Sequence, residues 1–508
     1  MDRLVRMTMD LDNAGSCVAK PVETRALRQT FVSGAVALTL ADVVVQAFNY
    51  GIQIAIARLF SPAVYGQFGI VVSVFVLLQV ALRWGLPGAM AYHVARDREA
   101  ARDILKKSIR MQIPYSLSLF VLFFLFSDAL AAALGDPTLS VYLRVAAFFI
   151  LTFALTPVYS GLLNGLGAFS ETAKIAVLRH LVTFLLIIGL LYAGSGLGGV
   201  IAAHAFGPLA SVAYAILVWR RTGYAGDKKV AARDIVTFGL PLFIGALAVT
   251  LLMRLDLFMI QASLGDQILT GLYTAASSLM RGPYFLSVSA GVVLFRLVAQ
   301  LQTQGASEAR GFISRAARYC LLALAPIPLV VSGSAEATIR LVFGQTYTMA
   351  APPFAVLSFC FIFMVLYNVV TTFISALNRP RIAMFLALFL IPVQIVLIYA
   401  GLSGGLVGVA LATTSSWLLG TVIGSVYLYR QGWLLPPQGK TLVRIGVAAL
   451  CVYLITLWLA PAGLWLLAFY PSIYFFYLLL LRVSGEISAG EIAALLSDCS
   501  PILARFRK

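Results

Sequence analysis

Long apolar runs follow one another along the whole chain. A run of about 20 residues can cross a bilayer as a helix, because a rise of ~1.5 Å per residue must cover ~30 Å of hydrocarbon. The composition agrees, with 61% hydrophobic and 11% charged residues, against about 25% charged residues in soluble domains. The predicted fold class is an all-α polytopic membrane protein. We expect about fourteen transmembrane helices, near 31–56, 65–86, 112–134, 141–164, 174–193, 197–219, 235–261, 268–296, 317–334, 351–376, 382–400, 405–429, 442–460 and 463–482.

Basic residues are concentrated in every second connection between these runs. Connections such as 96–110 and 220–233 are rich in Lys and Arg, whereas the intervening connections carry almost none. Cytoplasmic loops carry this excess, so we expect both termini in the cytoplasm and an even number of spans. The net charge of +17 then reflects topology, and we expect no nucleic-acid partner. In the C-terminal tail, Ser488 and Glu491 form a capping-box pattern that favours a short helix at the membrane surface.

Segments of the first half return in outline in the second half. Leu59–Gly66 (LFSPAVYG) pairs with Leu264–Gly271 (LGDQILTG) at an offset of 205, and Gly196–Val200 pairs with Gly405–Val409 at an offset of 209. A looser pair joins residues 161–169 to residues 373–381. One order at nearly one spacing indicates a duplicated unit of roughly two hundred residues.

Each repeated unit holds six expected spans in the same orientation. We therefore expect two six-helix bundles related by a pseudo-two-fold axis along the membrane normal, followed by a C-terminal helix pair. The expected boundaries are a cytoplasmic tail at 1–30, an N-lobe at 31–221, a cytoplasmic inter-lobe loop at 222–232, a C-lobe at 233–430, the helix pair at 431–484 and a cytoplasmic tail at 485–508.

Ionisable residues inside the expected spans are candidates for a functional site. A charge there costs ~2.5–3.5 kcal/mol and usually faces a bundle interior or a watery cavity. The candidates are Asp42, Arg83, Arg254, Asp256 and Arg281. Polar neighbours at helical spacing extend the helix faces of two of them, with Gln46, Asn49 and Gln53 beside Asp42, and Ser277 and Tyr284 beside Arg281. We expect this set to line a hydrated cavity between the lobes. The alternative is structural, with arginines and aspartates paired to hold the lobes and the uncharged groups joining helices.

Three arginines against two aspartates predict a mildly cationic cavity. A guanidinium group suits phosphate oxygens, so we hypothesise that Arg83, Arg254 and Arg281 bind the phosphate or pyrophosphate of an anionic substrate. Arg254 and Asp256 are two residues apart on one helix and should serve different partners. The sequence contains no P-loop, nucleophile elbow or metal-spaced His/Cys cluster, so we expect no enzyme activity, metal or cofactor. His204, alone in an apolar run, is expected to be packed and hydrogen-bonded.

Three motifs resemble those of a known transporter family. They are ARLFSPAVYGQFG at 57–69, FGLPLF at 238–243 and FGQTYTMAAPPFAVLS at 343–358. These are similar to the first loop, the seventh-helix opening and the entry to the tenth helix in the polysaccharide transporter branch (O-antigen and exopolysaccharide flippases) of the multidrug/oligosaccharidyl-lipid/polysaccharide exporter superfamily.

The resemblance implies that two lobes rock about a central cavity and move a polyprenyl-pyrophosphate-linked oligosaccharide across the bacterial inner membrane. It implies that Arg83, Arg254 and Arg281 meet the pyrophosphate. Coupling to H⁺ or Na⁺ through Asp42 is also implied, with Asp256 as a second candidate. A polysaccharide polymerase and a chain-length regulator are the implied protein partners, beside membrane lipids.

Three other functions stay open at this point. A cation-coupled drug exporter of the same superfamily usually has about twelve helices and an acidic cavity, which fits the arginines poorly. A peptidoglycan-precursor flippase shares fourteen helices and a cationic cavity. A membrane-embedded polymerase or ligase needs room for an active site at the outer face, where the connections of this chain are short.

Overall fold

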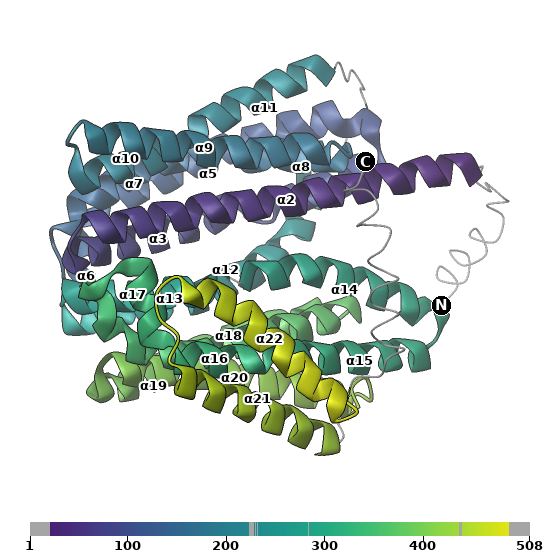
Figure 1. The fold of residues 1–508 in the computed structure, drawn as a ribbon. Helices are drawn as coiled ribbons and strands as arrows, with labels where there is room; N and C mark the ends of the chain where they lie inside the picture. Colours follow the sequence, from purple (N-terminus) through teal and green to yellow (C-terminus); the bar gives the residue numbers. More distant parts are fainter. Residues whose placement is uncertain are drawn as a thin grey trace.

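In this computed structural model, the structure describes residues 21–222, 228, 230, 232–282, 284–435 and 439–486, and every element in these residues is helical (Figure 1). The short surface helix expected around Ser488 and Glu491 lies outside the described residues, as does most of each expected tail. Residues 21–30, which we expected in the N-terminal tail, form the start of the first helix, α2.

The helices of the first half of the chain include several pairs that share one expected span, such as α7 with α8 and α10 with α11. The bounds are α2 (Pro21–Leu59), α3 (Pro62–Arg83), α4 (Leu86–Arg96), η1 (Arg98–Ala100), α5 (Ala101–Leu125), α6 (Ser127–Ala133), α7 (Leu139–Phe153), α8 (Thr156–Gly165), α9 (Phe169–Tyr192), α10 (Gly196–Phe206) and α11 (Pro208–Thr222).

The second half is built in the same way. Its elements are α12 (Ala232–Leu264), α13 (Gln267–Arg281), α14 (Tyr284–Gln304), α15 (Ala306–Leu324), α16 (Pro326–Gly333), α17 (Ala335–Phe343), η2 (Gln345–Ala350), α18 (Ala351–Ala376), α19 (Pro380–Gly401), η3 (Leu402–Gly404), α20 (Gly405–Arg430), α21 (Gly439–Leu459) and α22 (Trp465–Val483).

Twelve helical segments among the described residues are long and apolar enough to cross a membrane. The multi-pass all-α class is therefore confirmed, whereas the expected count of fourteen spans is not. One of the twelve segments, Pro380–Arg430, contains both α19 and α20, because η3 is too short a break to separate them. The expected span at 268–296 is divided between α13 and α14.

The helices form two groups that follow the order of the chain (Figure 1). In the first group α9 packs against α2, α10 and α11, while in the second α20 packs against α18 and α19. The groups meet where α3 packs against α12 and α13. The helix α21 packs against α16 and α22. The residue boundaries of the two lobes stay a prediction.

The first pair of repeated segments lies at the junction of the two groups. Ser61 accepts a hydrogen bond from the backbone of Val64 at the start of α3, and Asp266 caps the start of α13 in the same way. A Cβ on Gly66 would lie 2.3 Å from the carbonyl oxygen of Gln267, and one on Gly271 would lie 1.9 Å from that of Pro62. The two contacts are reciprocal at the repeat offset, as a two-fold axis through the crossing requires.

The second pair of repeated segments also has one local structure. Gly196 and Gly405 each begin a helix with a positive φ, of 58° and 60°, which favours glycine. The duplication therefore extends from sequence to backbone conformation.

Candidate functional site

Arg254 lies in α12, the helix that packs against α3 across the junction of the two groups. Its side chain is half-buried, and it forms no hydrogen bond or ion pair with any other part of the chain that the structure describes. The nearest charges that act on it are those of Arg281 and Asp256. An unpaired guanidinium in a membrane-spanning helix is costly, so Arg254 is available to an anionic ligand.

Asp256 and Arg281 form a buried ion pair between α12 and α13. Arg281 Nη2 donates to Asp256 Oδ1 at 2.8 Å and to Oδ2 at 3.1 Å. The Arg281 side chain is 6% exposed and the Asp256 side chain is 1% exposed. The Tyr273 hydroxyl and the Leu257 backbone N–H also donate to this carboxylate, at 2.9 and 2.8 Å. Buried charges persist when they are paired and hydrogen-bonded in this way.

This pair corrects the expected placement of two candidates. We expected Arg281 and Asp256 to line an open cavity, but each is buried and neutralised by the other. An arginine–aspartate pair, as in the structural alternative raised from the sequence, describes their geometry better, although this pair joins two helices of the second group and not the two lobes. As expected, Asp256 does not pair with Arg254. Any role of either residue toward a substrate or an ion stays a prediction.

Asp42 and Arg83 both have exposed side chains, on α2 and at the end of α3. Their charges are close enough to interact, although the two residues form no ion pair. The helix α2 thus presents an acid, and α3 a base, that are both accessible.

The uncharged candidates on α2 take part in hydrogen bonds. Asn49 donates to Gln46 Oε1 at 3.0 Å, and the Tyr65 hydroxyl donates to Gln53 Oε1 at 3.0 Å. All three candidates are half-buried. Their hydrogen bonds fit the structural alternative. Because α2 is continuous from Pro21 to Leu59, these residues lie on one helix with Asp42 at the expected helical spacing.

The candidates beside Arg281 are not open to a cavity. Ser277 and Tyr284 are buried, and the Ser277 hydroxyl donates to the Thr274 carbonyl oxygen at 3.4 Å. The expected polar stripe of this span is also interrupted, because α13 ends at Arg281 and α14 begins at Tyr284. Ser277 keeps its helical spacing to Arg281 within α13, whereas the break removes that basis for Tyr284.

Arg179 in α9 is a charged group that the sequence search missed. Its Nη1 donates to Gln79 Oε1 at 3.4 Å, its Nη2 lies 3.3 Å from His180 Nε2, and its guanidinium lies 5.1 Å from the centre of the Phe153 ring. Its charge also interacts with that of Arg83. Arg179 falls inside the expected span at 174–193, so the criterion that found the other arginines applies to it as well.

The hydrogen bonds of His180 fix its ring. Arginine only donates, so Nε2 accepts, and Nδ1 carries the proton that it donates to the Ala176 carbonyl oxygen at 2.9 Å. His204 stacks on Phe75, and its Nδ1 lies 3.0 Å from the Val200 carbonyl oxygen. It is packed and hydrogen-bonded, as expected.

The accessible arginines lie at different depths. At ~1.5 Å per residue, Arg254 is ~15 Å from the end of α12 at Leu264, whereas Arg83 is ~32 Å from the start of α3 at Pro62. The helix α13 begins directly after the end of α12, and Pro62 lies against Gly271 in α13. The end of α12 and the start of α3 are therefore on the same side of the molecule. The cationic positions are therefore spread through the membrane thickness rather than gathered in one ring.

Polar contacts join the two groups of helices at that same end. Gln267 in α13 donates to Asp136 Oδ2 at 2.7 Å, and Arg58 in α2 donates to the Val342 carbonyl oxygen at 3.0 Å. Asp136 also accepts from Gln67 in α3 at 3.3 Å. We call these contacts the end clasp.

Comparison with known proteins agrees with this architecture. A family model for polysaccharide biosynthesis proteins matches residues 55–352. No curated protein sequence matches the chain at significant similarity.

Several solved transporter structures share the fold. The lipid II flippase MurJ, in an inward closed conformation, is similar with a TM-score of 0.71 and 15% identity, over 89% of this chain and 98% of that one. An inward-facing MATE family multidrug transporter of the MOP superfamily gives 0.62 and 16%, over 78% and 98%. A MOP superfamily transporter from Pyrococcus furiosus, whose binding pocket has reverse polarity, gives 0.57 and 18%, over 78% and 95%.

Proposed function

Because the chain belongs to the polysaccharide biosynthesis protein family, we propose that it transports a polyprenyl-pyrophosphate-linked oligosaccharide across the bacterial inner membrane. The family and the fold are those of membrane transporters rather than enzymes. The product would supply O-antigen or exopolysaccharide synthesis, and both chain termini would lie in the cytoplasm. A polysaccharide polymerase and a chain-length regulator are the proposed partners.

The unpaired guanidinium of Arg254 is the observation that carries this proposal. Phosphate and pyrophosphate oxygens are the acceptors that fit its planar fork of donors. Arg83 and Arg179 offer a second cationic position at another depth. A pyrophosphate group could pass from one position to the other as the lobes move, so that its charge meets an arginine at each stage.

Alternating access is the proposed mechanism. The end clasp joins the two groups of helices at one end of the junction. Transport from the cytoplasmic to the outer leaflet would require the clasp to open while the opposite end closes. Asp42, the accessible acid, is the proposed site of coupling to H⁺ or Na⁺.

A peptidoglycan-precursor flippase is the second candidate, and the coverage of MurJ favours it over a drug exporter. MurJ matches 89% of the 508 residues, whereas the MATE transporter matches 78%. The difference is about 56 residues, close to the length of the expected helix pair at 431–484. The acidic cavity expected of a drug exporter is not favoured either, since Asp256 is neutralised by Arg281.

Gene deletion and complementation test the proposal. We expect deletion to abolish surface polysaccharide and to leave lipid-linked repeat units on the cytoplasmic side. Arg254→Ala should fail to complement, and Arg254→Lys should complement in part. Arg340→Ala should complement fully, because Arg340 is exposed and its ion pair is with Glu336 one turn away. Full complementation by a normally expressed Arg254→Ala protein would refute the role of Arg254. Cell lysis with accumulation of peptidoglycan precursors would instead favour the second candidate.

A further inference from the structure

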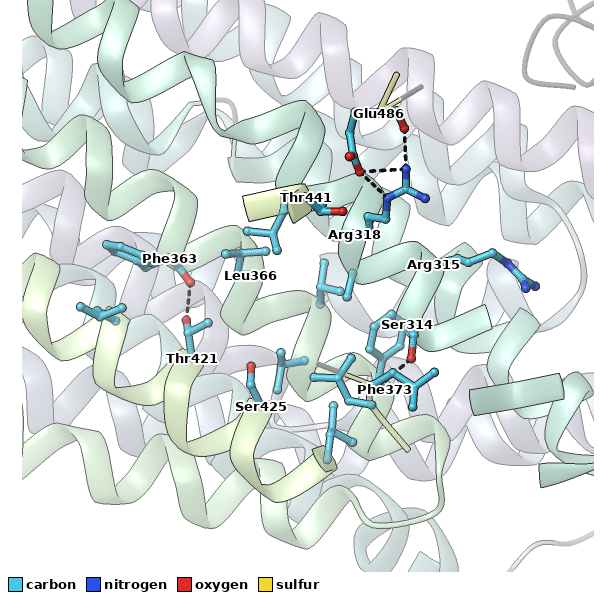
Figure 2. Close-up of a pocket in the computed structure, with 18 of the residues that line it drawn as sticks. Ser314, Arg315, Arg318, Phe363, Leu366, Phe373, Thr421, Ser425, Thr441 and Glu486 are labelled. Carbon is cyan, nitrogen blue, oxygen red and sulfur yellow. Dashed lines mark hydrogen bonds and ion pairs between the residues drawn. The ribbon is translucent and has the colours of Figure 1, made fainter. Parts of the chain in front are cut away.

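A cavity lies in the C-terminal half, separate from the arginines described above. Helices α15, α18, α20 and α21 surround it, and its volume is about 630 Å³ (Figure 2). Pockets that bind small molecules span about 300–1,000 Å³, so this one has room for a ligand. None of the proposed substrate-binding residues lines it.

The cavity has an apolar end and a basic end. Phe363 and Leu366 lie toward one end, whereas Arg315 and Arg318 lie toward the other (Figure 2). Arg444, at the start of α21, also lines the cavity. A molecule that fills this space must itself have an apolar body and a polar end.

The charge at the basic end is only partly balanced. Glu486, which is 3% exposed on its side chain, pairs with Arg318 at 3.0 Å and with Arg444 at 3.2 Å. It is the one acidic residue among the described residues that line the cavity. Arg315 is exposed and has no acidic partner within the described ranges. Arg315 thus adds a positive charge that no described carboxylate pairs with, which leaves the basic end suited to an anion.

The surroundings of the cavity are those of a lipid-facing surface. The helix α21 is long and apolar enough to span a membrane, and it exposes Leu442, Val443 and Val447 near its start. The basic end falls in connections that the charge pattern assigns to the cytoplasmic side. Anionic lipids are concentrated in that leaflet, where they attract clusters of Lys and Arg.

We infer that this cavity binds one anionic phospholipid, with an acyl chain against Phe363 and Leu366 and the phosphate at Arg315 and Arg444. A soluble anion would leave the apolar end unfilled, and a zwitterionic lipid would leave the excess positive charge unbalanced. The site is independent of the proposed transport function, because it shares no residue with it.

Thermal unfolding of the purified full-length protein tests the inference. The delipidated protein is supplied with phosphatidylglycerol or with phosphatidylethanolamine of the same acyl chains. We expect phosphatidylglycerol to raise the midpoint of unfolding more than phosphatidylethanolamine does. Native mass spectrometry should show one retained phosphatidylglycerol per chain.

Two variants with matched controls localise the effect. Arg315→Ala should abolish the advantage of phosphatidylglycerol, whereas Arg310→Ala should keep it, because Arg310 is exposed on the same helix and does not line the cavity. Ser425→Trp, which fills the cavity, should abolish retention of the lipid. Ser472→Trp, on the exposed face of α22, should not.

Three results would overturn the inference. One is equal stabilisation of the wild-type protein by the two lipids. Another is retention of phosphatidylglycerol by both Arg315→Ala and Ser425→Trp. The third is displacement of phosphatidylglycerol by equimolar polyprenyl phosphate, which would assign the cavity to the tail of a substrate.

Discussion

At the scale of single residues, the Arg281–Asp256 pair is a contact whose two members depend on each other. Replacing Asp256 by Ala leaves the Arg281 guanidinium buried without its carboxylate, so we expect the free energy of unfolding to fall by about 3–5 kcal/mol. Asp256→Leu combined with Arg281→Met removes both charges and should restore most of the loss. Thermal unfolding in one detergent measures both. A double variant as unstable as the single one would contradict this account.

Arg179 offers a second prediction at this scale. Arg179→Gln keeps a donor near Gln79 but removes the charge that acts with Arg83. A hydrogen bond between the charged Arg179 guanidinium and the phosphate of the substrate would contribute ~1.5–3 kcal/mol, so we expect its loss to lower transport roughly ten- to hundred-fold. Complementation or vesicle transport measures the loss. Gln79→Ala, which removes a hydrogen bond and keeps the charge, is the control and should have the smaller effect; the reverse order would exclude a role for the Arg179 charge.

The candidate site could be predicted only in part from the sequence. A charge inside an apolar run is conspicuous, which is why Arg254 and Asp256 were found and Arg179 should have been. Which charge is neutralised depends on how α12 and α13 approach, since Asp256 and Arg281 lie on different helices. No spacing rule along one helix contains that information, so the pairing required the structure.

At the scale of helices, the crossing of α3 and α13 is set by glycine. Gly66→Ala and Gly271→Ala each place a methyl group against a backbone oxygen, so the two helices must separate. If the crossing opens during transport, both variants should favour the open arrangement. A cysteine introduced near Gln67 should then become more accessible to a thiol reagent. Gly446→Ala is the control, because a Cβ there meets nothing within 4 Å. It should leave accessibility unchanged and stability equal or higher by about 0.5–1 kcal/mol. Unchanged accessibility in both crossing variants would contradict the prediction.

Helix starts were more predictable than helix breaks. The polar residues Ser61 and Asp266 occur at equivalent positions of the repeat, and each caps a helix because its side chain satisfies a free backbone N–H. The separation of α13 from α14 was not predicted. A bent helix and two shorter helices have the same apolar pattern, so hydropathy cannot distinguish them.

At the scale of the whole molecule, the two groups of helices are joined at one end by the end clasp, and alternating access requires this junction to open. Asp136 is central to it, since it accepts from Gln67 of its own half and from Gln267 of the other half. The contact between Gln67 and Thr138, at 2.9 Å, stays within one half. The same small region therefore contains one contact that transport must break and one that it can keep.

Disulfide cross-linking separates these two contacts. In a background with the five native cysteines replaced by Ser, Asp136→Cys with Gln267→Cys joins the halves, and Gln67→Cys with Thr138→Cys joins two segments of one half. We expect oxidation of the first pair to abolish transport and reduction to restore it, because the lobes are locked at their closed end. Oxidation of the second pair should leave transport unchanged. Transport that continues after the first pair has fully formed its disulfide would show that the halves do not separate at this end, and the rocking mechanism would then have to be abandoned.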